Sequence, residues 1–90
     1  MIIKEIKFSF LFEKRYKKLS EKIKARAKER EKIFRVNPFH PILKTHKLSG
    51  EEKEAWAFWI NYSYRIKFIF TGGNSVLFLD IGTHDIYKLT

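Results

Sequence analysis

Residues 55–81, AWAFWINYSYRIKFIFTGGNSVLFLDI, decide the fold of this 90-residue chain. Apolar and polar side chains alternate through segments 55–61, 64–70 and 75–81, and this period of two is typical of β-strands. Only two and four residues connect these segments. A parallel crossover needs a dozen or more residues, so the three strands are predicted to form consecutive antiparallel hairpins.

The sequence before this meander predicts a further strand and two helices. The expected elements are a strand at 1–8, a helix at 10–18 and a helix at 21–36. Ser9 and Ser20 are placed to cap the two helices, because a serine oxygen accepts a hydrogen bond from the first helical turn. Pro38 ends the second helix, since proline drives the residue before it out of helical conformation.

The predicted element order is therefore β-α-α-β-β-β, an α+β fold. We expect a helical hairpin packed on one face of a small, mostly antiparallel sheet, with a meander of three to four strands. Residues 86–89 are the candidate for the fourth strand of that meander. A chain of this length holds one hydrophobic core, so residues 1–90 are predicted to form a single domain.

Composition excludes several classes of protein. With 44% hydrophobic and 17% aromatic residues, the chain is too apolar to be disordered. The absence of cysteine excludes a disulfide scaffold, a thiolate zinc site and a cysteine nucleophile. The longest apolar run, residues 55–60, is far shorter than the roughly 20 residues of a membrane helix. The first residues are charged too early for a secretory signal, so we expect a soluble, cytoplasmic protein with no membrane contact.

Positive charge is concentrated in the predicted helices. The chain carries a net charge of +9, and residues 13–35 alone hold eleven basic and four acidic side chains. Such a field attracts polyanions, and nucleic acid, an acidic membrane and an acidic protein all qualify. The alternative is that the lysines only keep the helices in solution. Lys24, Lys28 and Lys32 are the helical candidates for RNA binding, with Lys47 and Lys67 outside the helices.

One arginine and two histidines are the candidates for chemistry. Arg65 and Lys67 alternate with the apolar residues of their strand, so Arg65 is expected to project from the side of the sheet that the helices leave uncovered. A guanidinium suits phosphate binding because its donors form a fixed, permanently charged fork. His46 and His84 lie beside loops, and histidine exchanges protons near neutral pH. Together these groups would suffice for cleavage of RNA without a metal ion.

Each of these residues also has an ordinary structural interpretation. Arg65 would then be a solvated strand residue, and both histidines would be turn residues with local hydrogen bonds. No spacing typical of a metal site joins the histidines, and we expect neither a metal nor a cofactor. The aromatic residues at 56–64 are expected mainly in the core or in cross-strand pairs, although one or two, with Tyr87, could stack on an unpaired base.

Several motifs together resemble the RelE/ParE superfamily of bacterial and archaeal toxins. They are Asn37-Pro38, THKLSG at 45–50, Trp56, YRIKF at 64–68 and DIGTHDIY at 80–87. The resemblance covers essentially the whole chain. It implies a RelE-like fold, a cognate antitoxin with which the chain forms a hetero-oligomer, and, in the RelE, YoeB and YafQ branches, cleavage of mRNA on the ribosome.

The resemblance also assigns roles to individual residues. Arg65 matches the arginine of the RelE branch, whose strand lysines have no counterpart here. His46 and His84 look like the histidines of the YafQ branch, and the YoeB branch also ends with a histidine and a tyrosine, here His84 and Tyr87. The YoeB glutamate has no match, because Ile42 stands about where it would fall. The resemblance therefore implies a histidine-based endoribonuclease with His46, Arg65, His84 and Tyr87 in catalysis, and leaves the general base open between His46 and another group.

Two other functions remain as alternatives. ParE toxins share the fold but poison DNA gyrase and lack the nuclease residues, which the presence of His46, Arg65 and His84 disfavours here. The third class is a basic, non-catalytic module that binds nucleic acid or an acidic protein. Convergence of the three residues on one exposed face would favour the enzyme, and their dispersal would favour an alternative.

Overall fold

The computed structural model describes residues 1–50 and 54–87. The elements in chain order are β1 (Glu5–Phe8), α1 (Phe10–Lys17), α2 (Glu21–Val36), the 3-10 helix η1 (Pro41–Leu43), β2 (His46–Lys47), β3 (Trp56–Trp59), β4 (Arg65–Gly72), β5 (Ser75–Gly82) and the 3-10 helix η3 (His84–Tyr87). The predicted α+β fold and its element order are confirmed, and the short strand β2 is an addition that the sequence did not indicate.

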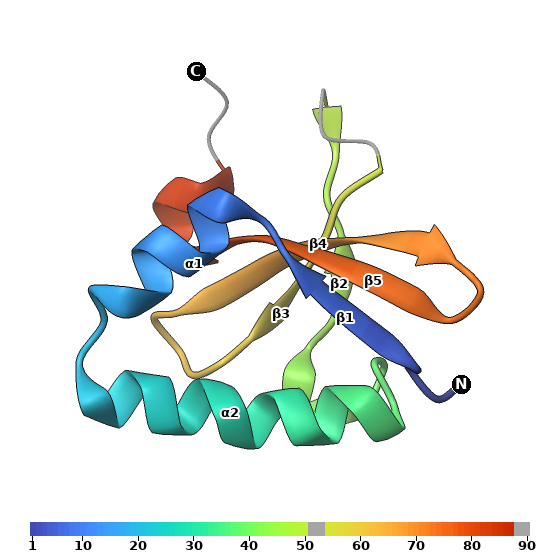
Figure 1. The fold of residues 1–90 in the computed structure, drawn as a ribbon, viewed down its shortest axis with the longest axis horizontal. Helices are drawn as coiled ribbons and strands as arrows, with labels where there is room; N and C mark the ends of the chain where they lie inside the picture. The colour runs from blue at the N-terminus through green and yellow to red at the C-terminus, as the bar shows by residue number, and fades with distance from the viewer. Residues whose placement is uncertain (51–53, 88–90) are drawn as a thin grey trace.

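The strands of the described residues form one mixed sheet in the order β1-β5-β4-β3-β2. β3, β4 and β5 pair antiparallel, as the short connections predicted, and β2 pairs antiparallel with β3. β1 instead pairs in parallel with β5, with Ile6 opposite Val76, so the first strand lies beside the last one (Figure 1). This parallel pair is possible because both helices and three strands separate β1 from β5 along the chain.

Several predicted boundaries differ from the structure by one or two residues, and the first and last predicted strands differ by more. The first strand begins at Glu5 rather than at residue 1. Residues 86 and 87 lie in η3, so the prediction of a last strand at 86–89 is wrong for them, and residues 88 and 89 lie outside the described part of the chain. Ile86 is buried because the helical turn η3 that contains it packs on the sheet, and not because it belongs to a strand.

Both serine caps are confirmed. The Ser20 oxygen accepts a hydrogen bond from the Ile23 amide at 3.3 Å, and the Ser9 oxygen accepts one from the Phe12 amide at 3.0 Å. The Ser9 hydroxyl also donates to the carbonyl of Leu79 at 2.7 Å. Ser9 therefore begins α1 and fixes that helix to β5 at the same time.

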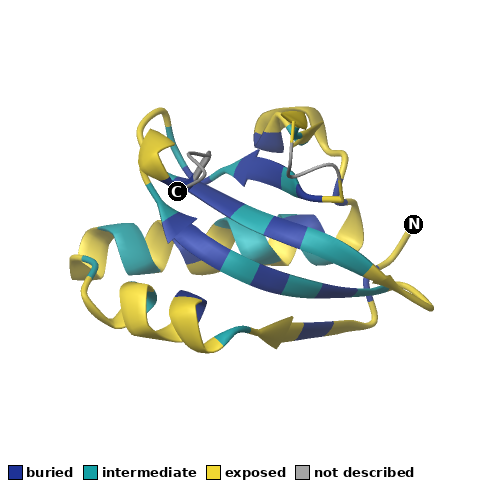
Figure 2. Ribbon diagram, turned by 90° about the horizontal axis from the view of Figure 1, so that it is seen from above, coloured by how far each residue is buried: buried dark blue, intermediate teal, exposed yellow. Residues whose placement is uncertain are grey.

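The core is an aromatic cluster between α2 and the sheet. The fully buried ring of Phe34 lies 4.7 Å from that of Phe58, 4.9 Å from Phe68 and 5.6 Å from Phe78. Phe12 of α1 packs on Phe78 from the same side at 5.5 Å. Both helices therefore cover one face of the sheet, and in Figure 2 β4 and β5 alternate between buried and less buried residues.

The β4–β5 hairpin closes with a two-residue turn. Gly72 pairs with Ser75, which leaves Gly73 and Asn74 at the turn with φ values of 61° and 63°. Two consecutive left-handed residues match the right-handed twist of the strands, and glycine and asparagine tolerate this conformation best. Within the described ranges, no helix combines the length and the apolar content that a membrane span requires.

Candidate active site on the open face of the sheet

Strand pairing places two rows of side chains on the face opposite α1 and α2, which we call the open face. Directly paired residues of an antiparallel sheet project from the same side. One row consists of Trp59, Arg65 and Gly82, and the neighbouring row of His46, Ala57, Lys67 and Asp80. The prediction that Arg65 and Lys67 project away from the helices is therefore confirmed.

The expected exposure of Arg65 is wrong, because its side chain is enclosed and only 4% of the residue is accessible to solvent. The guanidinium donates to the carbonyl of Asn61 at 2.9 Å and to that of Tyr62 at 2.5 Å. These carbonyls belong to the turn between β3 and β4, which bends back over the open face. Arg65 thus replaces water as the hydrogen-bond donor to these carbonyls. The hydrogen bonds in turn offset the cost of removing the guanidinium charge from water.

The ring of Trp59 covers the Arg65 guanidinium from one side. The central carbon of the guanidinium lies 3.9 Å from the ring centroid, which is a close cation–π contact. The ammonium of Lys44 approaches the same ring at 5.4 Å. Trp59 was predicted to lie in the core or in a cross-strand pair, and the cross-strand pair is confirmed. Its cross-strand partner is Arg65, and the two residues flank the turn between β3 and β4.

His84 completes the arrangement. Its Nε2 lies 3.3 Å from a terminal guanidinium nitrogen of Arg65. A guanidinium has no acceptor, so Nε2 is the acceptor of this hydrogen bond. His84 is itself exposed to solvent. The structure therefore joins a solvent-accessible imidazole to a permanent positive charge, and we call this pair the His84–Arg65 pair.

Helix η3 is held against the sheet where Gly82 lacks a side chain. A Cβ atom at Gly82 would lie 2.9 Å from Cγ2 of Ile86, which is closer than van der Waals contact allows. The Lys67 ammonium donates to the Ile86 carbonyl at 3.1 Å. Gly82 and Lys67 therefore fix the short helix that carries His84, and no local sequence pattern indicated this function of the glycine.

His46 also lies on the open face, but the strand pairing places it too far from the His84–Arg65 pair for contact. It is opposite Ala57, which is opposite Lys67, so two strand spacings, about 10 Å, separate His46 from β4. Its Nδ1 lies 2.9 Å from the carbonyl of Lys44, and the ring is exposed. The structure therefore brings Arg65 and His84 together and places His46 on the same face at the edge of the sheet. Within the described ranges, no three His, Asp or Glu side chains cluster as a metal site requires.

The remaining predicted site residues are dispersed. Tyr87 belongs to η3, and its side chain lies outside the described part of the structure. Lys67 is on the open face, whereas Lys47 pairs with Trp56 and so projects from the other side at the edge strand. The helical candidates Lys24, Lys28 and Lys32 form one stripe of α2, in the layer behind the sheet. Any RNA contact that these lysines make is therefore separate from the His84–Arg65 pair.

An ion pair between the buried Asp80 and the half-exposed Arg15 connects the open face to α1. Asp80 is 4% exposed, and its carboxylate accepts two hydrogen bonds from Arg15, at 2.9 and 3.1 Å. The Ile81 amide donates to the same carboxylate at 2.8 Å. Asp80 was not among the predicted site residues. An acidic residue at a buried position of the last strand was the signal for such a partner.

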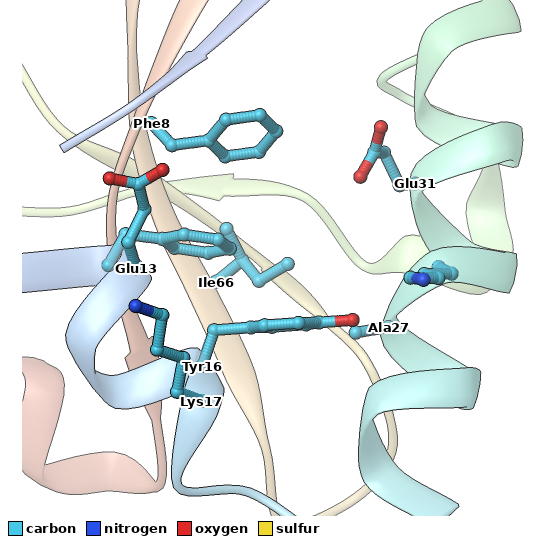
Figure 3. A pocket seen from close by; sticks show the side chains of 9 residues that line it. Phe8, Glu13, Tyr16, Lys17, Ala27, Glu31 and Ile66 are labelled. Atoms are coloured by element: carbon cyan, nitrogen blue, oxygen red, sulfur yellow. The ribbon is translucent and has the colours of Figure 1, made fainter. Parts of the chain in front are cut away.

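A second surface lies in the helical layer, where α1, α2 and β1 enclose an apolar groove of about 270 Å³ (Figure 3). Its apolar lining comprises Phe8, Phe12, Tyr16, Ala27 and Ile66, and its rim carries Glu13, Lys17, Lys28 and Glu31. Burial raises the pKa of Tyr16 above its usual value of 10.0, and the charges of Glu31 and Glu21 raise it further. The groove is therefore lined by a phenol that stays neutral up to alkaline pH.

No protein-family model and no curated protein sequence matches the chain. Solved structures do match it. A YoeB/ParE toxin from Agrobacterium tumefaciens is 13% identical, with a TM-score of 0.77 over 90% of this chain and 99% of that one. The DinJ–YafQ toxin–antitoxin complex of E. coli is 21% identical, with a TM-score of 0.72 over 94% and 97%. The archaeal RelE–RelB complex of Pyrococcus horikoshii is 15% identical, with a TM-score of 0.72 over 91% and 96%. The chain has the fold of RelE, YoeB and YafQ.

Proposed function

We propose that the chain is the toxin of a type II toxin–antitoxin pair and an endoribonuclease that cleaves translated mRNA on the ribosome. The observation that carries this proposal is the His84–Arg65 pair, an imidazole and a guanidinium 3.3 Å apart on the open face. The shared fold with RelE, YoeB and YafQ supports the choice of this reaction over other uses of the same groups.

The proposed reaction is an attack of the ribose 2′-oxygen on the adjacent phosphorus. A general base takes the 2′-hydroxyl proton, the O2′–P bond forms, and the P–O5′ bond breaks as a general acid protonates the leaving 5′-oxygen. The products are a 2′,3′-cyclic phosphate and a 5′-hydroxyl. His84 performs one of these two proton transfers, and His46 is the candidate for the other.

Substrate binding must rearrange the pair. Nε2 of His84 now accepts from Arg65, so it can neither take nor give a proton at that nitrogen until the contact opens. A phosphate oxygen is a stronger acceptor for the guanidinium than a neutral imidazole is. Entry of the phosphate between the two side chains would release Nε2 for proton transfer and leave Arg65 to stabilise the charge that develops on the phosphate.

The neutralising partner in this proposal is an antitoxin that covers the apolar groove of the helical layer. The groove is bordered by the edge strand β1 and by the basic helix α2. An apolar segment with acidic flanks would bury the groove and form ion pairs with the basic side chains of α2. Complexes with antitoxins are described for the E. coli and S. aureus structures that share the fold.

The decisive test uses His84→Gln with translating ribosomes. The glutamine oxygen can still accept from Arg65, but glutamine has no proton to exchange, so cleavage should slow by about 10²–10⁴ while ribosome binding persists. His40→Asn is the matched control, because His40 caps η1 through its ring and an asparagine oxygen can replace that acceptor. Cleavage of wild-type rate in His84→Gln would remove His84 from the reaction, and products with a 5′-phosphate would overturn the reaction itself.

A further inference from the structure

Tyr62 presents an unusually exposed aromatic ring. It is 80% accessible, and among the large apolar side chains of the described residues only Phe10 is more exposed. The turn that carries it is rigid, because the Asn61 side chain accepts hydrogen bonds from the amides of Ser63 at 2.9 Å and Tyr64 at 2.8 Å. The ring therefore stands in solvent on a fixed support, where it has little to pack against within the chain.

This ring adjoins the His84–Arg65 pair. The carbonyl of Tyr62 accepts from the Arg65 guanidinium, and the Tyr62 ring meets the Trp59 ring at 5.9 Å with the planes at 88°. Trp59 in turn stacks on the guanidinium. Tyr62, Trp59, Arg65 and His84 thus form a continuous series of contacts, which joins an exposed aromatic ring to an enclosed cation and an exposed imidazole.

Positive charge lies next to Trp59, the ring that the Tyr62 ring contacts. Lys44 reaches the Trp59 ring, so a second cation stands beside the turn in addition to Arg65. An exposed aromatic ring flanked by cations is the combination that binds single-stranded nucleic acid: bases stack on the ring while the cations neutralise phosphates. A duplex offers no free base faces to such a ring, so the arrangement fits an unpaired strand.

We propose that Tyr62 is a binding residue on which one unpaired nucleobase of the RNA stacks, next to the phosphate held at the His84–Arg65 pair. The proposal rests on the proposed function for the identity of the ligand. It assigns to the β3–β4 turn a role in positioning the strand, and it makes Tyr62 responsible for affinity and not for proton transfer. Stacking is tolerant of base identity, so this contact would set the register of the strand more than its sequence.

The test is a binding experiment that does not depend on cleavage. Ribosome complexes are programmed with an mRNA that carries a 2′-deoxynucleotide at the cleavage position, and the dissociation constant of the chain is measured by fluorescence anisotropy. Tyr62→Ala should weaken binding about 5- to 150-fold, which is the range of a lost base stack. Tyr62→Phe should bind within about 3-fold of the wild type, since the ring is retained, and Tyr62→Leu should resemble Tyr62→Ala because it keeps the apolar bulk without the ring.

Abasic nucleotides identify the stacked base. When one abasic site is moved along the mRNA, a single position should reproduce the loss seen in Tyr62→Ala, and at that position the substitution should have no further effect. Phe10→Ala is the control, because Phe10 is equally exposed but lies on α1. Wild-type affinity in Tyr62→Ala, or the same loss at every abasic position, would overturn the proposal. Because binding is measured without turnover, slow cleavage alone would count against the proposed reaction and leave the stacking site intact.

Discussion

A guanidinium nitrogen of Arg65 lies 3.3 Å from Nε2 of His84, although 19 positions separate the two residues in the sequence. The same guanidinium supports the β3–β4 turn through two backbone carbonyls. Arg65 therefore has a structural function as well as its proposed catalytic one. Substitutions of Arg65 test both functions at once, and stability has to be measured together with activity.

Arg65→Ala is expected to lower the free energy of unfolding by about 2–4 kcal/mol, because it removes the cation–π contact with Trp59 and leaves the turn carbonyls without their donor. Arg65→Lys should recover part of the loss, since an ammonium cannot reproduce the planar fork. Urea denaturation followed by tryptophan fluorescence measures both. An unfolding free energy within about 0.5 kcal/mol of the wild type in Arg65→Ala would show that the turn does not need the guanidinium.

Gly82→Ala should displace η3, because the added methyl group would lie 2.9 Å from Cγ2 of Ile86. Cleavage should then fall at least about 10-fold, since His84 moves with its helix, and a misplacement of about 1 Å is costly in catalysis. The double variant Gly82→Ala/Ile86→Leu should restore most of the rate, because leucine has no methyl group at that branch. Equal rates in the single and double variants would refute this account of the positioning of His84.

Replacement of Lys24, Lys28 and Lys32 by glutamine should make ribosome binding less dependent on salt. If each lysine contacts one phosphate, the slope of log affinity against log salt should decrease in magnitude by about 2. The rate of cleavage by bound protein should persist, because this stripe lies on α2, behind the sheet that carries His84. Titration at several salt concentrations measures the slope, and an unchanged slope would mean that these lysines only solvate the helix.

Phe8→Ala should weaken antitoxin binding about 10- to 100-fold, since Phe8 lines the apolar groove and a buried aromatic anchor commonly dominates such an interface. Cleavage by the free chain should not change. Phe39→Ala is the control, because Phe39 is similarly exposed but lies outside the groove, beside Trp56. Calorimetric titration with the product of the neighbouring gene tests this, and equal losses in both variants would place the antitoxin elsewhere.

Tyr16 makes a specific contribution to stability at alkaline pH. Its pKa is raised in the folded chain by burial and by Glu31 and Glu21, so folding favours the neutral phenol. This contribution is present below the unfolded value of about 10 and is lost as the pH rises through the folded value. Between about pH 9 and about pH 11, the melting temperature of Tyr16→Phe should therefore fall less than that of the wild type. A parallel fall would contradict the raised pKa.

Much of the fold could be predicted from local patterns. The alternation in 64–70 gave the orientation of Arg65, and the serines before both helices gave their first turns, because each signal depends on near neighbours in the sequence. The parallel pairing of β1 with β5 could not be predicted in this way. Its register depends on how the helices that separate the two strands in the sequence pack on the sheet, and no local pattern records that packing.

The site was predicted less completely than the fold. Arg65 and His84 were both candidates and the structure brings them into contact, but the enclosure of Arg65 was missed, because periodicity shows the face of a strand and not what folds over that face. The cover consists of the Asn61–Tyr62 backbone and the Trp59 ring. Gly82 was missed for a similar reason: its importance lies in the side chain that it lacks and in the later residue, Ile86, that fills the space.

The pairing of the first strand with the last has a consequence for synthesis. Ser9 donates to Leu79 across 70 positions, and among the described strands β1 pairs only with β5. During translation β1 emerges first and must wait for residues 75–82, and contacts so distant in sequence form slowly because a long loop has to close. The sheet edge, the anchor of α1 and the helix that carries His84 all depend on that last strand. A nascent chain that lacks β5 is therefore inert, and maturation of the site belongs to the final stage of folding.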